Sequence, residues 1–307
     1  MRTTLKKAVE STLCRSGLTR LACRRRAQDT IVLAYHNIVP EGASVHGDRS
    51  LHLPQREFAR QLDLIRRTHE VVPLSRLLEP REGRPRRPQA VITFDDACQG
   101  AVTSGVDELV RRGLPATVFV APAFVGGRSF WWDALSGGAA GGLSNELRQH
   151  ALEALAGKDE DVRLWAERVS TPLRDVPEHQ TCATEAQLQA LDRVEGITLA
   201  SHTWSHPNLA RIPEEELADE LQRPLVWLRE RFRHVMPWLS YPYGIASERV
   251  MQAAAEAGYE GALLVEGGWL GRPSRKPVDP FALPRQNVPA GISLSGFELR
   301  VSGLLTG

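Results

Sequence analysis

The chain has 307 residues, and its 38 Lys and Arg side chains against 37 Asp and Glu leave a formal net charge of only +1. This balance gives no general electrostatic reason to expect a nucleic-acid partner, and a hydrophobic content of 42% is ordinary for a globular protein. A membrane-spanning helix is not predicted either, because the sequence contains no run of about 18 consecutive apolar residues.

Residues 1–30 form a basic segment, with eight Lys and Arg residues against Glu10 and Asp29. Its leucines and valine recur at roughly helical spacing, which predicts an amphipathic helix. Two interpretations stay open: peripheral contact with an anionic membrane surface, or a terminal helix packed on the domain. No signal-peptide core follows Lys6 and Lys7, so we expect a cytoplasmic protein, with the inner membrane as the surface for any peripheral contact.

From residue 31 onward, short apolar segments alternate with amphipathic ones. The predicted strands are residues 31–39, 90–96, 116–122, 196–202, 237–244, 261–267 and 281–288. Helices with apolar residues at i, i+3 and i+4 are predicted at residues 56–69, 106–113, 185–194, 213–222 and 247–258. The alternation predicts an α/β fold with a parallel sheet. Some seven units in about 260 residues favour a distorted (β/α) barrel over an open sheet.

Two stretches interrupt this alternation. Residues 79–88 are basic and rich in proline, which predicts a surface loop. Residues 124–195 are too long for one crossover connection and include a Gly/Ala-rich patch at 137–142, so we expect a helical insertion over one end of the barrel. The predicted domain therefore spans residues 31–290, followed by a C-terminal tail at 291–307.

Two pairs of polar residues follow apolar strands at their C-terminal ends, where βα barrels place their active sites. Asp95 and Asp96 end VITFDD, and His202 and His206 lie in SHTWSH. Adjacent carboxylates repel each other, and a bound cation would relieve that repulsion. The two imidazoles can converge on the same metal ion, and one carboxylate completes an Asp/His/His set with a position left for water. The second carboxylate can then accept a proton from that water, which is the arrangement for metal-assisted hydrolysis.

In order along the chain, TFDDACQG, SHTWSH and SYPYG resemble the first three motifs of the polysaccharide deacetylase family, the NodB-homology carbohydrate esterases (carbohydrate esterase family 4). The resemblance runs from about residue 31 to 290 and implies the distorted barrel of the NodB-homology fold. The roles that it implies are a general base (Asp95), three ligands for Zn²⁺, Co²⁺ or Ni²⁺ (Asp96, His202 and His206) and an oxyanion-hole N–H (Tyr243, in a turn shaped by Pro242).

The sequence departs from the family pattern at two catalytic positions, besides a mild change to Ala97 where the first motif usually has glycine. The third motif has Ser240 where the family has an arginine that orients the base; Arg285 either reaches the site and replaces it or forms a structural ion pair. The late histidine that serves as general acid is missing. In a permuted branch, similar to the poly-N-acetylglucosamine deacetylases, this histidine lies in an N-terminal Tyr-His pair, which Tyr35-His36 matches. The resemblance thus implies His36 as general acid; the alternative is a strand-end histidine with a local hydrogen bond.

Adjacent tryptophans, Trp131 and Trp132, follow a Gly-Gly loop at the start of the predicted insertion. Aromatic faces stack on sugar rings, so these residues are candidates for a substrate subsite. The alternative interpretation is that one or both anchor the insertion to the barrel.

We therefore expect a metal-dependent deacetylase that hydrolyses the N-acetyl or O-acetyl group of a glycan or of a lipid-linked or nucleotide-linked saccharide. Metal-assisted hydrolysis follows from the residues themselves, whereas the sugar and the acetyl group come from the family resemblance. Two alternatives remain open: an amidase or cyclic imide hydrolase acting on a non-sugar substrate, and a non-catalytic glycan-binding homologue.

Overall fold

Seven parallel strands close into a barrel in the computed structural model, which describes residues 2–79, 81, 83, 85–137, 142–271 and 278–305. In order around the barrel they are β1 (Thr30–Tyr35), β11 (Leu283–Asn287), β9 (Gly261–Gly267), β8 (Val235–Ser240), β7 (Ile197–Ser201), β6 (Ala116–Val120) and β5 (Gln89–Phe94). The ring closes where β5 pairs with β1, from Gln89 opposite Thr30 to Phe94 opposite Tyr35. The prediction of a barrel with about seven parallel strands is confirmed.

The barrel strands are predictable because parallel strands covered by helices are buried on both faces and carry uninterrupted apolar sequences. Every residue of β1, β5 and β6 is buried. The predicted strand 31–39 is in fact two strands: β1 pairs in the barrel, whereas β2 (Asn37–Val39) pairs with β3 (His52–Pro54) in a separate ladder. His36 lies at this break. Two short strands extend the sheet, β4 (Glu70–Val71) beside β5 and β10 (Trp269–Leu270) antiparallel to β1.

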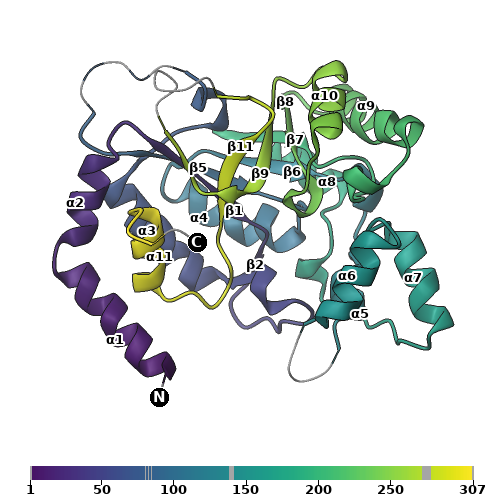
Figure 1. Cartoon of the computed structure of the whole chain (residues 1–307), viewed down its shortest axis with the longest axis horizontal. Coiled ribbons are helices and arrows are strands. Elements are labelled where there is room, and N and C mark those ends of the chain that lie inside the picture. Colours follow the sequence, from purple (N-terminus) through teal and green to yellow (C-terminus); the bar gives the residue numbers. More distant parts are fainter. Residues whose placement is uncertain are drawn as a thin grey trace.

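Helices connect and cover the strands (Figure 1). They are α1 (Arg2–Arg15), α2 (Leu18–Arg25), α3 (Gln55–Thr68), α4 (Val106–Val110), α5 (Trp131–Leu135), α6 (Asn145–Glu153), α7 (Asp159–Arg168), α8 (Glu185–Leu191), α9 (Glu214–Arg231), α10 (Glu248–Glu256) and α11 (Leu294–Val301). Several begin at residues that cap free backbone N–H groups. Ser144, Ser247 and Ser293 each accept a hydrogen bond from the backbone N–H three residues later, and Thr184 forms a full capping box with Gln187.

Both ends of the chain lie on one flank of the barrel, where α1 and α2 run beside α11 and α3 (Figure 1). The Thr19 hydroxyl donates to Glu298 at 2.7 Å, and the Ser293 hydroxyl donates to Glu10 at 2.6 Å. The N-terminal helices are therefore packed on the domain, and the segment 291–307 contains a helix, α11. Across the described residues, no helix is both long and apolar enough to cross a membrane.

The helices α5 to α8 fall within residues 124–195, and α5, α6 and α7 lie together on the other side of the barrel from α1 and α2 (Figure 1). These helices occupy the stretch for which the sequence predicts a helical insertion. Most of the Gly/Ala-rich patch at 137–142, namely residues 138–141, lies outside the described residues, as do positions 80, 82 and 84 of the predicted basic loop.

Candidate active site

A cavity of about 310 Å³ lies at the C-terminal ends of the barrel strands. Nine of the ten site residues proposed from the sequence line it, and the tenth, Pro242, is buried in the turn beside Tyr243. These residues come from segments as far apart as β1 and β11. The cavity is thus built by closure of the barrel, because no two neighbouring segments of the chain could form it alone.

Asp96, His202 and His206 meet in this cavity, and all three side chains are buried. Asp96 Oδ1 lies 3.5 Å from the Nε2 atom of each histidine, and the two Nε2 atoms are 3.1 Å apart. Ligands about 2.1 Å from a tetrahedral Zn²⁺ would lie about 3.4 Å from one another. The distances between the three donor atoms are therefore close to the ligand–ligand distance expected in a tetrahedral coordination shell.

The hydrogen bonding of this cluster also fits a cation. His202 Nδ1 donates to the Ser240 carbonyl at 2.7 Å, which leaves the Nε2 lone pair directed toward the other two residues. Asp96 Oδ1 is buried and has no hydrogen-bond partner among the described residues. Burial and the neighbouring His202 lower the pKa of His206 to about 3, so its imidazole is neutral near pH 7. Burial lowers the pKa of His202, but the charges of Asp95 and Asp96 outweigh burial and raise it, and a bound cation would displace the proton. Two imidazoles and one carboxylate are a donor set that suits Zn²⁺, Co²⁺ or Ni²⁺.

Backbone strain is concentrated at the same place. Seven described non-glycine residues have a positive φ, and the five that lie in the site motifs are Asp96, Ala97, Thr203, His206 and Tyr243. Each such conformation costs about 1–3 kcal/mol and persists only where the surroundings hold it. The three motif turns are therefore held in unfavourable conformations, and three of these residues, Asp96, His206 and Tyr243, line the cavity.

Glu220, on α9, holds the turn between the two histidines. Its Oε2 atom accepts hydrogen bonds from the backbone N–H groups of Trp204 and Ser205, at 2.9 and 2.8 Å, and its Oε1 atom accepts one from the Ser205 hydroxyl. Glu220 is not among the site residues predicted from the sequence. A signal was present, because Glu220 falls on the buried stripe of α9 beside Leu217 and Leu221, where an acid needs a partner.

Arg285, on β11, forms a bidentate ion pair with Asp95. Its two terminal nitrogens each lie 2.8 Å from a different carboxylate oxygen of Asp95, and one of them also donates to the Ser240 hydroxyl at 2.8 Å. Arg285 is only 1% exposed. Burial alone would raise the pKa of Asp95, but the charge and hydrogen bonds of Arg285 hold it well below its usual range. The carboxylate is thus ionised, and the guanidinium fixes its orientation.

The remaining predicted residues form the walls. His36 is half-buried where β1 ends, and the Tyr243 ring lies 4.7 Å from that of His206. Trp131 Nε1–H donates to the Tyr243 hydroxyl at 3.2 Å, and the Trp132 ring lies 5.0 Å from that of His206. Both rings are buried, with exposures of 1% for Trp131 and 6% for Trp132; Trp132 packs against His206, and Trp131 packs against Trp132. Their use as a sugar-stacking surface stays a prediction.

Seven further residues line the cavity without having been predicted as site residues: Leu51, Arg148, Leu152, Gly244, Ile245, Val265 and Asn287. Asn287 ends β11, so the rule that locates barrel sites at strand ends could have identified it. Arg148 and Leu152 are on α6, so only the folded insertion brings them to the site, whereas Leu51 comes from the segment just before β3. Arg148 also forms an ion pair with Asp48, which ties α6 to the segment before β3.

Comparisons with known proteins match this architecture. A family model for polysaccharide deacetylases matches residues 82–262, which include Asp95 and His206 but neither His36 nor Arg285. The YxkH protein of Bacillus subtilis (strain 168), whose name assigns it to the polysaccharide deacetylases, is 21% identical over 276 residues, 89% of this chain and 76% of its own.

Two solved structures are similar to this chain in fold. IcaB from Ammonifex degensii is 18% identical, with a TM-score of 0.58 over 91% of this chain and 97% of its own. The Streptococcus pyogenes deacetylase PplD, solved in complex with acetate, is 15% identical, with a TM-score of 0.57 over 87% of this chain and 96% of its own.

Proposed function

This chain belongs to the polysaccharide deacetylase family, and we propose that it hydrolyses the N-acetyl group of an amino sugar within a glycan or a lipid-linked or nucleotide-linked saccharide. The observation that carries the proposal is the meeting, in one buried cavity, of the Asp96, His202 and His206 donor set with an ionised and firmly oriented Asp95. Asp96, His202 and His206 would hold Zn²⁺, or Co²⁺ or Ni²⁺ in its place. Such a cation would acidify the attacking water and polarise the acetyl carbonyl.

Asp95 is proposed as the general base. Arg285 occupies one side of the carboxylate and prevents it from turning, so the face directed into the cavity can accept a proton from water. A carboxylate whose pKa is held so low is a weak base, and it therefore suits a nucleophile that has already been made more acidic. Arg285 thus supplies the orienting role that the family assigns to the residue at position 240.

His36 is proposed as the general acid, because it lines the same cavity and imidazole is the side chain that most often serves in acid–base catalysis. It would donate a proton to the nitrogen of the leaving amino sugar as the bond to the acetyl carbon breaks. The backbone N–H of Tyr243, in the turn formed with Pro242, would donate a hydrogen bond to the oxygen of the tetrahedral intermediate.

The shape of the cavity suits a small part of a larger substrate. Its volume of about 310 Å³ is at the lower end of the range for ligand sites, about 300–1,000 Å³. Leu51, Leu152 and Val265 line it beside the charged residues and would contact the acetyl methyl group. We infer that one acetylated sugar unit enters while the remainder of the saccharide stays outside.

A cyclic imide hydrolase was an alternative from the sequence because the third motif lacks its arginine. Because the guanidinium of Arg285 pairs with Asp95, the site has an arginine after all, and this reason for preferring an imide hydrolase no longer applies. The test is to incubate metal-loaded protein with N-acetylglucosamine oligomers and, separately, with simple cyclic imides. We expect acetate release and no imide opening; imide opening without acetate release would refute the proposal.

Two variants test the assigned roles. Asp95→Asn should keep its metal and lose acetate release, whereas His36→Ala should lower kcat with metal content unchanged. Leu164→Ser, at an exposed position of α7, is the control and should behave like the parent protein. An active Asp95→Asn variant would disprove the base assignment.

A further inference from the structure

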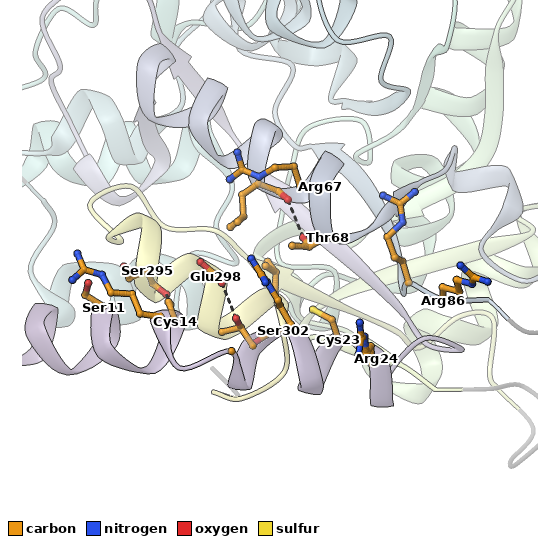
Figure 2. Close-up of a pocket in the computed structure, with 17 residues that line it drawn as sticks. Ser11, Cys14, Cys23, Arg24, Arg67, Thr68, Arg86, Ser295, Glu298 and Ser302 are labelled. Atoms are coloured by element: carbon orange, nitrogen blue, oxygen red, sulfur yellow. Dashed lines mark hydrogen bonds between the residues drawn. The ribbon is translucent and has the colours of Figure 1, made fainter.

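A second cavity, of about 720 Å³, lies between the N-terminal helices α1 and α2 and the helices α3 and α11 of the barrel flank (Figure 2). Its lining includes six arginines: Arg15, Arg20, Arg24, Arg67, Arg86 and Arg87. Among the described residues that line it, Glu298 is the only carboxylate, and this carboxylate already accepts a hydrogen bond from Thr19. The cavity therefore carries a strong excess of positive charge.

These arginines lack acidic partners. All six are exposed, and none forms an ion pair with a carboxylate of any described residue, whereas arginines elsewhere, such as Arg112 and Arg163, are paired. Guanidinium groups gathered without counter-charge repel one another and attract anions. Phosphate is the anion that their planar donor geometry fits best, since it can accept two parallel hydrogen bonds.

Exposed apolar side chains lie on the same flank. Of the eleven large hydrophobic residues exposed in the described part of the chain, five are here: Val9, Leu18 and Leu21 on α1 and α2, and Leu304 and Leu305 after α11. Leu18, Leu21 and Leu304 line a smaller adjoining cavity together with Arg25 and Arg26. Arginines alternating with exposed leucines on short amphipathic helices are typical of surfaces that lie in a membrane interface.

We propose that this flank, made of α1, α2, Arg67, Arg86, Arg87, Leu304 and Leu305, docks on a membrane rich in anionic phospholipids. The lipid phosphates would enter the arginine-lined cavity while the exposed leucines reach the boundary of the acyl chains. A soluble phosphate compound would satisfy the arginines but would give the leucines no partner, which is why the lipid surface is preferred. The docking goes beyond the proposed deacetylation, because no residue of this flank lines the catalytic cavity.

The first test is co-sedimentation of the full chain with vesicles of phosphatidylcholine, with and without phosphatidylglycerol. We expect partitioning only onto the anionic vesicles, and weaker partitioning as salt rises. Arg20→Gln with Arg24→Gln should weaken it about 30-fold, since each cationic side chain near an anionic surface contributes about a factor of five. The matched control, Arg229→Gln with Arg233→Gln, removes two exposed arginines near the end of α9 and should bind like the parent.

The second test removes the apolar part. Leu18→Ser with Leu21→Ser, at positions 43% and 46% exposed, should weaken partitioning about tenfold with an unchanged circular dichroism spectrum. Leu164→Ser with Val169→Ser, on and beside α7 and similarly exposed, is its control and should bind normally. Failure of the parent protein to bind anionic vesicles would overturn the proposal. The proposal would also be overturned, in favour of a soluble phosphate ligand, if the arginines were required to bind inorganic pyrophosphate and the two leucine substitutions left vesicle binding unchanged.

Acetate release separates the failure of this proposal from that of the proposed function. The Arg20→Gln, Arg24→Gln variant should release acetate from soluble oligomers at the parent rate, because its changes lie outside the catalytic cavity. Lost acetate release in this variant, with folding intact, would contradict the separation of the docking flank from the catalytic cavity.

Discussion

Replacing Arg285 with methionine would leave Asp95 as a buried carboxylate without its cation. The side chain of Arg285 is buried and donates to Asp95 twice, and once each to the Ser240 hydroxyl, the Thr93 hydroxyl and the Leu264 carbonyl. Removing one partner of a buried ion pair costs about 3–5 kcal/mol, because the remaining charge is not compensated. We expect Arg285→Met to lower the free energy of unfolding by about 4 kcal/mol.

A double-variant cycle assigns this loss to the ion pair. Arg285→Met combined with Asp95→Asn removes both charges, so it should be more stable than Arg285→Met alone by about 1.5–3 kcal/mol. Urea denaturation of chelator-treated protein gives these free energies without a contribution from bound metal. The matched control is Arg76→Met, which breaks the exposed Arg76–Glu79 pair and should cost less than about 1 kcal/mol.

Arg285→Lys extends the test to catalysis. Lysine keeps the charge but cannot make two parallel hydrogen bonds, so Asp95 would be less firmly oriented. We expect retained metal and a lowered kcat. The proposed role of the Arg285–Asp95 ion pair would be refuted if Arg285→Met were as stable as Arg76→Met, or if the double variant were no more stable than Arg285→Met.

Two other predictions concern residues outside the catalytic groups. Glu220→Gln should weaken divalent-cation binding about tenfold or more, because Glu220 holds the turn that carries His206. Competition with a chelator measures this affinity. The control, Glu216→Gln on the same helix, should leave the affinity unchanged. Burial lowers the pKa of His69 to about 4, so the unfolded chain, with a histidine pKa near 6.5, binds the proton first as the pH falls. The stability due to His69 is therefore complete above about pH 6.5 and declines toward pH 4. Between pH 7 and 4.5, the free energy of unfolding of the parent protein, measured by urea denaturation, should fall by about 2.5 kcal/mol more than that of His69→Gln. Equal decreases in the two proteins would contradict this.

The barrel strands could be predicted because burial on both faces imposes a continuous apolar sequence, as in β1 and β5. The order of the strands around the barrel could not be predicted. β11, near the C-terminal end, inserts between β1 and β9, and the barrel closes through β1 and β5. Such pairings join segments remote in the chain, and no local pattern encodes which strand meets which. The break at His36 was missed for the same reason, since it depends on β2 leaving the barrel to pair with β3.

Within the site, Asp95, Asp96, His202 and His206 could be located because polar residues directly after apolar strands are conspicuous. The contact of Arg285 with Asp95 could be considered but not decided from the sequence, because it depends on the position of β11 in the ring. The burial of both Trp131 and Trp132 could not be decided from the sequence either. It results from the way in which α5 folds over the histidine turn, a packing contact between an insertion and the barrel.

Acetate release during titration of a divalent cation into chelator-stripped protein tests the central claim most directly. The parent protein should release none when stripped and should regain full activity at one bound Zn²⁺ per chain. Asp96→Ala should neither bind the ion tightly nor respond, whereas Asp95→Asn should bind it and stay inactive. Full acetate release by the stripped parent protein, or by Asp96→Ala, would contradict the proposed site.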